Sequence, residues 1–122
     1  MRLVALTLVL GAALVAPAAY ATTALRPPAR MQVTSSEFEF VLSRTSLRRG
    51  RAIIELVNLG EDPHDLAIRR NAKGARTYRT KIVLPGKEAS ISFRLFPGRY
   101  TLWCTVGDHR TQGMVATITV RK

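Results

Sequence analysis

Most of the chain consists of short runs in which hydrophobic and polar side chains alternate, or in which β-branched residues follow one another. Gly, Pro and Asn residues interrupt these runs at intervals of about 8–12 residues, which is the spacing of strands and turns in β-sandwiches. No long window shows the repeat of three and four residues that marks an amphipathic helix. The predicted strands are at residues 37–42, 52–57, 65–69, 78–84, 89–95, 100–105 and 115–121. The pattern therefore predicts an all-β sandwich.

The N-terminal segment has a different pattern, which is typical of a signal peptide. A basic residue follows the first methionine, residues 3–15 carry no charge, and residues 19–21 form the small–x–small triplet that signal peptidases recognise. The uncharged stretch is shorter than the roughly 20 apolar residues that span a membrane. We therefore expect residues 1–21 to be a signal peptide and residues 22–30, rich in Pro and Arg, to be a linker. Residues 31–122 would form one domain, in the periplasm or outside the cell.

Size and charge narrow the classes of function. A chain of 122 residues has room for one domain, and its single cysteine excludes an intramolecular disulfide and a four-cysteine metal site. The 19 basic and 8 acidic residues give a net charge of +11. The arginines are single or paired and no recognition helix is predicted, so we expect no nucleic acid partner. The charge fits contact with an anionic membrane or an acidic redox protein without specifying either.

Residues that bind soft metal ions gather near the C-terminus. Cys104 ends one predicted strand, Met114 begins the last one, and His109 lies on the turn between them. His64 opens an earlier predicted strand, which can bring a second imidazole to the same end of the sandwich. Two imidazoles and a thiolate, with a weak axial thioether, are the ligands of a blue (type 1) copper site. We therefore predict one type 1 copper ion bound by these four residues.

Two other interpretations use only part of this set. Cys104 and His109 could form the nucleophilic pair of an enzyme. Asp65 or Asp108 would then orient the imidazole, but the second histidine and the methionine would have no role. Structural zinc prefers nitrogen, thiolate or carboxylate ligands and does not use a thioether. We therefore expect no catalytic residues and no enzyme.

Four segments resemble those of the cupredoxins, the small exported blue-copper proteins that include plastocyanin, azurin and rusticyanin. They are residues 36–40 (SEFEF), 57–66 (VNLGEDPHDL), 84–87 (LPGK) and 97–104 (PGRYTLWC), in the family's order. The resemblance covers the whole predicted domain and implies a Greek-key β-sandwich of seven or eight strands. It also implies three strong ligands and one axial ligand. The strong ligands would be His64, Cys104 and His109, and the axial ligand would be Met114.

The resemblance also implies a function. Cupredoxins carry single electrons between larger redox proteins, so the expected partner is a cytochrome or a copper-containing oxidase or reductase. His109 would be the imidazole nearer the surface, and His64 would be the buried one. We expect a monomer. The alternative is a copper-binding or copper-delivery protein that exchanges metal through exposed methionines, for which Met31 is the spare candidate in the domain.

Two positions depart from the family pattern. Asp65 follows the first histidine where many members have asparagine, and Gly107-Asp108 precedes the second where members often have Pro-Gly. Together with Glu61 and Asp62, these residues place four acidic side chains beside the two histidines. They either make the metal-binding end less basic than the body, which would orient it toward a partner, or reflect the preference of turns for such residues.

Overall fold

The computed structural model describes residues 25–122, and the predicted signal peptide at residues 1–21 lies outside the described residues. The described chain contains nine β-strands. They are β1 (Ala29–Ser36), β2 (Glu39–Leu42), β3 (Ser46–Arg48), β4 (Gly50–Asn58), β5 (Ala67–Arg70), β6 (Thr77–Arg79), β7 (Glu88–Leu95), β8 (Gly98–Trp103) and β9 (Val115–Arg121). Within this part of the chain, no helix has the length and apolar character needed to cross a bilayer.

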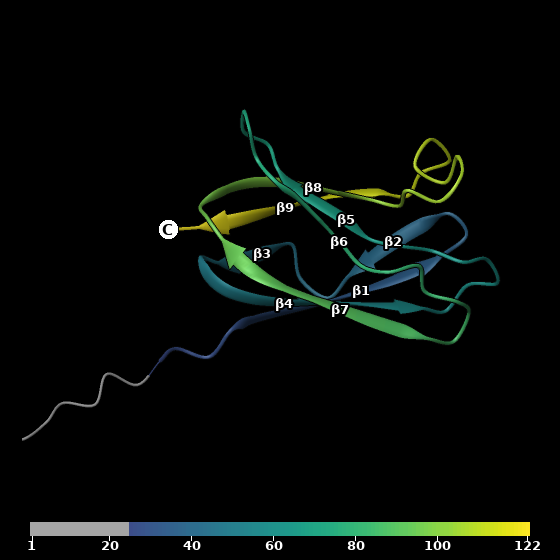
Figure 1. The fold of residues 1–122 in the computed structure, drawn as a ribbon, viewed down its shortest axis with the longest axis horizontal. Coiled ribbons are helices and arrows are strands. Elements are labelled where there is room, and N and C mark those ends of the chain that lie inside the picture. The colour runs from purple at the N-terminus through teal and green to yellow at the C-terminus, as the bar shows by residue number, and fades with distance from the viewer. Residues whose placement is uncertain (1–24) are drawn as a thin grey trace, which may run out of the picture.

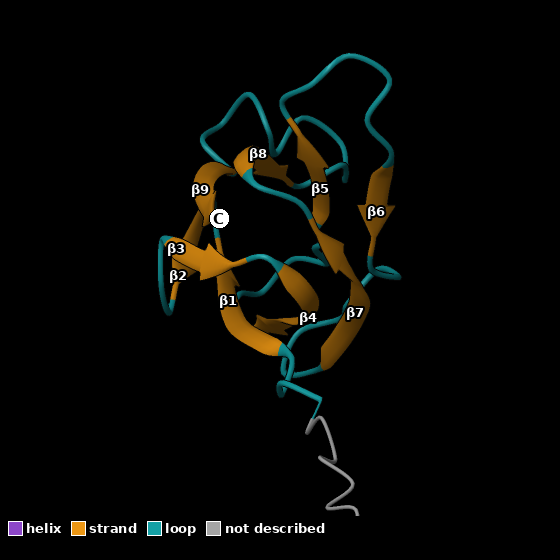
Figure 2. Cartoon of the chain, turned by 90° about the vertical axis from the view of Figure 1, so that its left-hand side faces the viewer, coloured by secondary structure: helices purple, strands orange, loops and turns teal. Residues whose placement is uncertain are grey.

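The strands form two mixed sheets that face each other across the core (Figures 1 and 2). One sheet has the order β2-β1-β4-β7, and the other has the order β3-β9-β8-β5-β6. The β1–β4 and β3–β9 pairs are parallel, whereas the other pairs are antiparallel. Consecutive strands often belong to different sheets, so the loops that cross between the sheets gather at the two ends of the sandwich.

Alternate side chains of each strand fill the space between the sheets, as the period of two requires. In β4, for example, Ala52, Ile54 and Leu56 are fully buried while the residues between them reach the outer face. The core cluster of the described chain lies entirely between Ala29 and Val120. A chain that begins at residue 22 therefore contains the complete sandwich.

The predicted all-β sandwich is confirmed, with nine strands where the sequence indicated seven or eight. The hydrophobic pattern does not predict β1, because its inward face includes a buried serine, Ser35, and its first two residues fall in the predicted linker. It also does not predict β3, whose three residues include one buried side chain, Leu47. The run at residues 37–42 divides into a turn at residues 37–38 and the strand β2.

The two ends of the sandwich differ in the residues they carry. The histidine end consists of the loops at residues 37–38, 59–66 and 104–114, and the loop between β8 and β9 is at the right of Figure 1. The opposite end, at the left of Figure 1, includes β3, the start of β4 and the end of β7. We call it the arginine end, and its defining residues are Arg26, Arg48, Arg49, Arg51 and Arg94.

Candidate metal centre

The four predicted ligands come from two loops of the histidine end. His64 is near the end of the loop between β4 and β5, where its backbone N–H and carbonyl exchange hydrogen bonds of 3.1 and 2.7 Å with Val83. Cys104 directly follows β8, and Met114 directly precedes β9. His109 lies in the turn between them. The strands therefore hold both loops at fixed positions relative to each other.

Three buried donor atoms face one another at this end. The Nδ1 atoms of His64 and His109 are 3.2 Å apart. The Cys104 Sγ atom lies 4.0 Å from the first nitrogen and 3.7 Å from the second. A trigonal ion bonded to nitrogen at about 2.0 Å and to sulfur at about 2.3 Å separates its donors by about 3.5–3.7 Å. The residues present therefore fit one shared metal ion.

Met114 is fixed beside these donors by its backbone. Its N–H donates to the carbonyl oxygen of His109, and its own carbonyl oxygen accepts from the N–H of Cys104, both at 3.1 Å. Its side chain is fully buried. The structure thus brings all four predicted residues together, with the methionine in the same hydrogen-bonded loop as the cysteine and the second histidine.

Glu37 makes a contact with His64 that the sequence did not indicate. One oxygen of its carboxylate, Oε1, lies 2.9 Å from the His64 Nε2 atom. The same oxygen accepts from the backbone N–H groups of Asp62 at 2.8 Å and Glu61 at 3.0 Å. These two amides, together with the histidine, lower the pKa of the Glu37 carboxyl to about 2. Because an ionised carboxylate only accepts, Nε2 carries the hydrogen, and in the neutral imidazole the lone pair is then on Nδ1, facing the other donors.

The loop that carries His64 has an internal scaffold. The buried Asn58 side chain donates to the carbonyl oxygens of Asp62 at 2.7 Å and Val83 at 2.9 Å, and its own oxygen accepts from the Gly60 N–H at 2.9 Å. A Cβ at Gly60 would collide with the carboxylate of Glu37, which would then have to leave its position. The loop conformation and the glutamate contact therefore depend on each other.

Asp65 joins the two ligand loops. Its fully buried carboxylate accepts from the backbone N–H of Thr105 at 2.6 Å, from the Thr105 hydroxyl, and from Arg79 at 2.9 Å. Burial alone would raise the pKa of the Asp65 carboxyl, but these hydrogen bonds and the arginine charge outweigh it and hold that pKa below its usual value. An aspartate can thus connect the segments after the histidine and after the cysteine, although it lacks the amide donor of asparagine.

The cysteine and the two histidines of the site are all buried, but to different degrees. Burial raises the pKa of the Cys104 thiol, while the backbone groups of Asp65 and Val106 oppose this effect. The side chain of His64 is 0% exposed, whereas that of His109 is 11% exposed. The site is therefore closed to water on most sides, and His109 is its edge nearest the surface, as the sequence predicted.

The hydrogen bonds do not provide the third group that a nucleophilic pair would need. Asp65 is directed toward Thr105 and Arg79, and the Asp108 carboxylate accepts from Gln112 at 2.8 Å. Asp62 Oδ2 is 3.9 Å from His109 Nε2, which exceeds hydrogen-bond distance. These carboxylates therefore do not orient the His109 ring for general-base work.

Comparison with known proteins is consistent with this donor set. The chain matches the family model for copper binding proteins of the plastocyanin/azurin family over residues 28–121. Its fold is similar to that of reduced auracyanin from the photosynthetic bacterium Roseiflexus castenholzii, with 18% identity and a TM-score of 0.62 over 75% of this chain and 95% of that chain. No curated protein sequence matches the chain.

Two further structures share the fold. Amicyanin from Paracoccus versutus is similar over 74% of this chain and 79% of its own, with 16% identity and a TM-score of 0.53. A multicopper oxidase is similar over 79% of this chain and 46% of its own, with 14% identity and a TM-score of 0.56. The same sandwich therefore occurs both in single-domain proteins and as part of a longer chain.

Proposed function

Because this chain belongs to the plastocyanin/azurin family of copper-binding proteins, its metal is copper, and we propose that it is an exported one-electron carrier. Members of this family generally carry electrons, and related cupredoxins are often periplasmic or extracellular. The proposed ligands of its single type 1 copper ion are His64, Cys104, His109 and Met114. These residues would hold a copper ion, which would supply one-electron chemistry between its Cu(II) and Cu(I) states.

One observation carries the proposal. Two imidazole nitrogens and a thiol sulfur, from segments 40 residues apart in the chain, lie within 4.8 Å of one another in a buried cluster. No carboxylate belongs to this cluster. Nitrogen and thiolate donors suit copper in both oxidation states, whereas hard ions prefer oxygen. A buried set held by strands also needs little rearrangement when the charge of the site changes.

The residues around the ligands have separable tasks in this proposal. Cys104 binds as the thiolate, so its buried thiol releases a proton when metal enters. Glu37 orients His64, and Asp65 holds the two ligand loops at a fixed separation. His109, as the most exposed ligand, gives the shortest route for an electron to a redox partner outside the cytoplasm, such as a cytochrome or a copper oxidase. We expect the carrier to act as a monomer.

Copper delivery, the alternative, has less support. It was expected to use exposed methionines, with Met31 as the candidate. Met31 is instead buried in the core at 2% exposure, and Met114 is fully buried. Within the described residues, no methionine is therefore placed to pass copper to another protein.

The proposal is tested by adding Cu(II) to the chain of residues 22–122 and recording the visible spectrum and its reversible reduction. We expect an intense blue band that disappears on reduction, because the thiolate is bonded directly to the oxidised metal. Cys104→Ser should abolish the band, whereas Met114→Leu should keep it and shift the reduction potential. Circular dichroism should show both variants folded. Tight Cu(I) binding by the parent without a blue Cu(II) form would contradict the electron-carrier proposal and favour delivery.

A further inference from the structure

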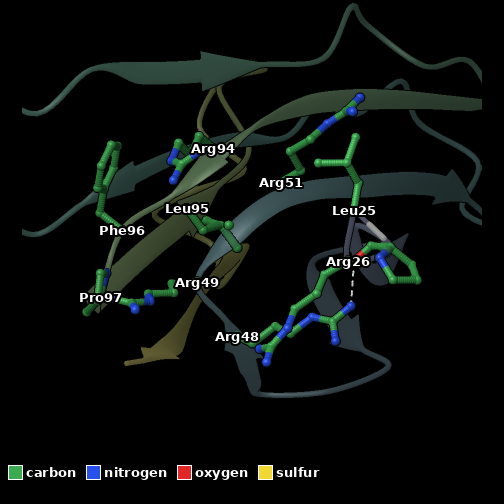
Figure 3. Close-up of a pocket in the computed structure, with 11 residues that line it drawn as sticks. Leu25, Arg26, Arg48, Arg49, Arg51, Arg94, Leu95, Phe96 and Pro97 are labelled. Atoms are coloured by element: carbon green, nitrogen blue, oxygen red, sulfur yellow. Dashed lines mark hydrogen bonds between the residues drawn. The ribbon is translucent and has the colours of Figure 1, made fainter. Parts of the chain in front are cut away.

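The arginine end contains a pocket of about 590 Å³ that has a basic lining. It is formed by the first described residues, the connection between β3 and β4, and the end of β7. Five of its 11 lining residues are arginines, and none is acidic. Figure 3 shows these side chains around the pocket, namely Arg26, Arg48, Arg49, Arg51 and Arg94.

Within residues 25–122, these arginines have no carboxylate partner. The described residues contain three ion pairs, and none of them includes an arginine of the pocket. Arg48 donates to the backbone carbonyl oxygen of Pro27 at 2.5 Å, the contact drawn as a dashed line in Figure 3. All five side chains are exposed. Their positive charge is therefore available to an external anion.

The register of the sheets places like charges opposite each other at this end. Arg51 on β4 pairs with Arg94 on β7, and both lie on the outer face of the sheet. Arg48 on β3 is in register with Arg121 on β9. Like charges directly opposite in a sheet destabilise it. A repeated unfavourable pairing at one end is expected where the charges are kept for binding rather than for stability.

Exposed apolar side chains accompany the arginines. Leu25 is 91% exposed and Phe96 is 53% exposed, and both line the same pocket. A small soluble phosphate would contact the guanidinium groups and leave these side chains in water. A bilayer surface accommodates both kinds of group, because phosphates pair with arginine while apolar side chains enter the headgroup boundary.

The chain also enters the described fold at this end. Residues 1–24 join it at Leu25, beside the pocket, and their sequence includes the uncharged segment 3–15. The described chain therefore begins at the end that carries the arginines, and not at the end that carries the histidines.

We propose that the arginine end is a docking surface for an anionic phospholipid bilayer. The guanidinium groups of the pocket pair with lipid phosphates, and Leu25 and Phe96 enter the interface. The histidine end then faces away from the bilayer, toward the aqueous space. The docking itself does not depend on the proposed function. Only its consequence, that this orientation presents a copper ligand to redox partners, rests on that function.

The test measures co-sedimentation of residues 22–122 with vesicles of equal parts phosphatidylglycerol and phosphatidylcholine. We expect binding that is absent with phosphatidylcholine alone and is lost at high salt. Arg51→Gln combined with Arg94→Gln should weaken vesicle binding about 30-fold, because each basic side chain near an anionic bilayer contributes about 1 kcal/mol. The control, Lys81→Gln with Lys87→Gln, removes the same charge from exposed sites near the histidine end and should change binding less than about threefold.

A second pair of variants separates the bilayer from a soluble anion. Leu25→Ser with Phe96→Ser keeps every arginine, and we expect it to weaken vesicle binding severalfold. If the arginine and lysine variants lost vesicle binding equally, the proposal would be overturned, because binding would then follow net charge alone. Full binding by the serine variant, together with release of the protein by inorganic phosphate, would also overturn it and identify a soluble phosphate site. The blue spectrum, or circular dichroism for the metal-free chain, checks that each variant is folded, so failure of docking and failure of copper binding are distinguishable.

Discussion

The two ends of this sandwich use their charged residues in opposite ways. At the histidine end, the carboxylates of Glu37 and Asp65 accept hydrogen bonds that fix the loops. At the arginine end, the charged side chains are exposed and have no carboxylate partner in the part of the chain that the structure describes. The same strands connect both ends, so the strands alone do not determine this difference. It indicates that one end is built to hold a geometry and the other to meet a partner.

The comparison also changes the interpretation of the acidic residues. The sequence allowed them to be either an electrostatic guide for a partner or ordinary turn residues. Asp65 is neither, because it is fully buried and joins the two ligand loops. Glu37 organises the loop that carries the first histidine. Two carboxylates of the histidine end, those of Glu37 and Asp65, therefore have structural tasks.

The largest effect that we predict is the loss of the buried carboxylate of Asp65. Asp65→Ala leaves the backbone N–H of Thr105 without its acceptor and removes the ion-pair partner of Arg79, which keeps its hydrogen bond to the Thr105 hydroxyl oxygen at 2.6 Å. Because Arg79 is 54% exposed and can reach water, we expect the free energy of unfolding to fall by about 2–3 kcal/mol rather than by the full cost of an isolated buried charge. Urea denaturation of the metal-free chain measures this value.

Two variants accompany that measurement. Asp65→Asn keeps an acceptor for the Thr105 amide and should lose less than the alanine variant. Arg94→Gln, at the arginine end, should change the free energy of unfolding by no more than about 0.5 kcal/mol. An alanine variant as stable as the parent would show that the two ends do not differ in how they use charge.

The second prediction concerns the metal rather than the fold. Glu37→Ala removes the acceptor that orients the His64 ring, and loss of such a partner weakens metal affinity about 10–100-fold. Glu37→Gln keeps an oxygen at that position and should weaken affinity less. Competition with a copper chelator measures both values, and the reduction potential should shift in the same variants. Arg94→Gln should leave affinity and potential unchanged.

Gly60 provides an independent check on this contact. Gly60→Ala introduces a Cβ where the Glu37 carboxylate lies, so the carboxylate must move away from His64. The substitution should therefore weaken copper binding in the parent but have little further effect in the Glu37→Ala background. Additive losses in the double variant would mean that the carboxylate does not act through this contact.

These residues show which parts of the site the sequence could predict. Cys104, His109 and Met114 lie within eleven residues of one another, so their residue types and the turn between them are visible as a local pattern. His64 was predicted from its place at the start of a strand. The structure brings it to Cys104 and His109 at the distances given above, but its role as a ligand stays a prediction.

Glu37 and Asn58 could not be predicted in the same way. Glu37 contacts residues 24–27 positions away, and an alternating apolar run placed it inside a strand. Asn58 acts through Val83, 25 positions away, and the pattern shows it only as the residue that ends a strand. The all-β fold was predictable because the period of two is local, whereas β1 and β3 were not, because one has a partly polar inward face and the other is very short.

The smallest effect that we predict is a gain in stability at the arginine end. Arg51 and Arg94 are directly opposite each other, and like charges in such a position destabilise the sheet. A pair of opposite charges there stabilises the sheet by about 0.2–1 kcal/mol. Arg94→Glu and Arg51→Glu should therefore each raise the free energy of unfolding by about 0.5 kcal/mol, and less at high salt. Both single variants should bind anionic vesicles more weakly than the parent. Thermal unfolding at low and high salt measures the gain.

The double variant separates this pairing from a general effect of net charge. Arg51→Glu combined with Arg94→Glu lowers the net charge further, but it places two carboxylates opposite each other. If the pair determines the gain, the double variant should be less stable than either single variant. If net charge determines it, the double variant should be the most stable of the three, and the unfavourable pairing would no longer support a binding role for this end. Copper affinity should be unchanged in all three variants, since the substitutions lie at the end opposite the ligands.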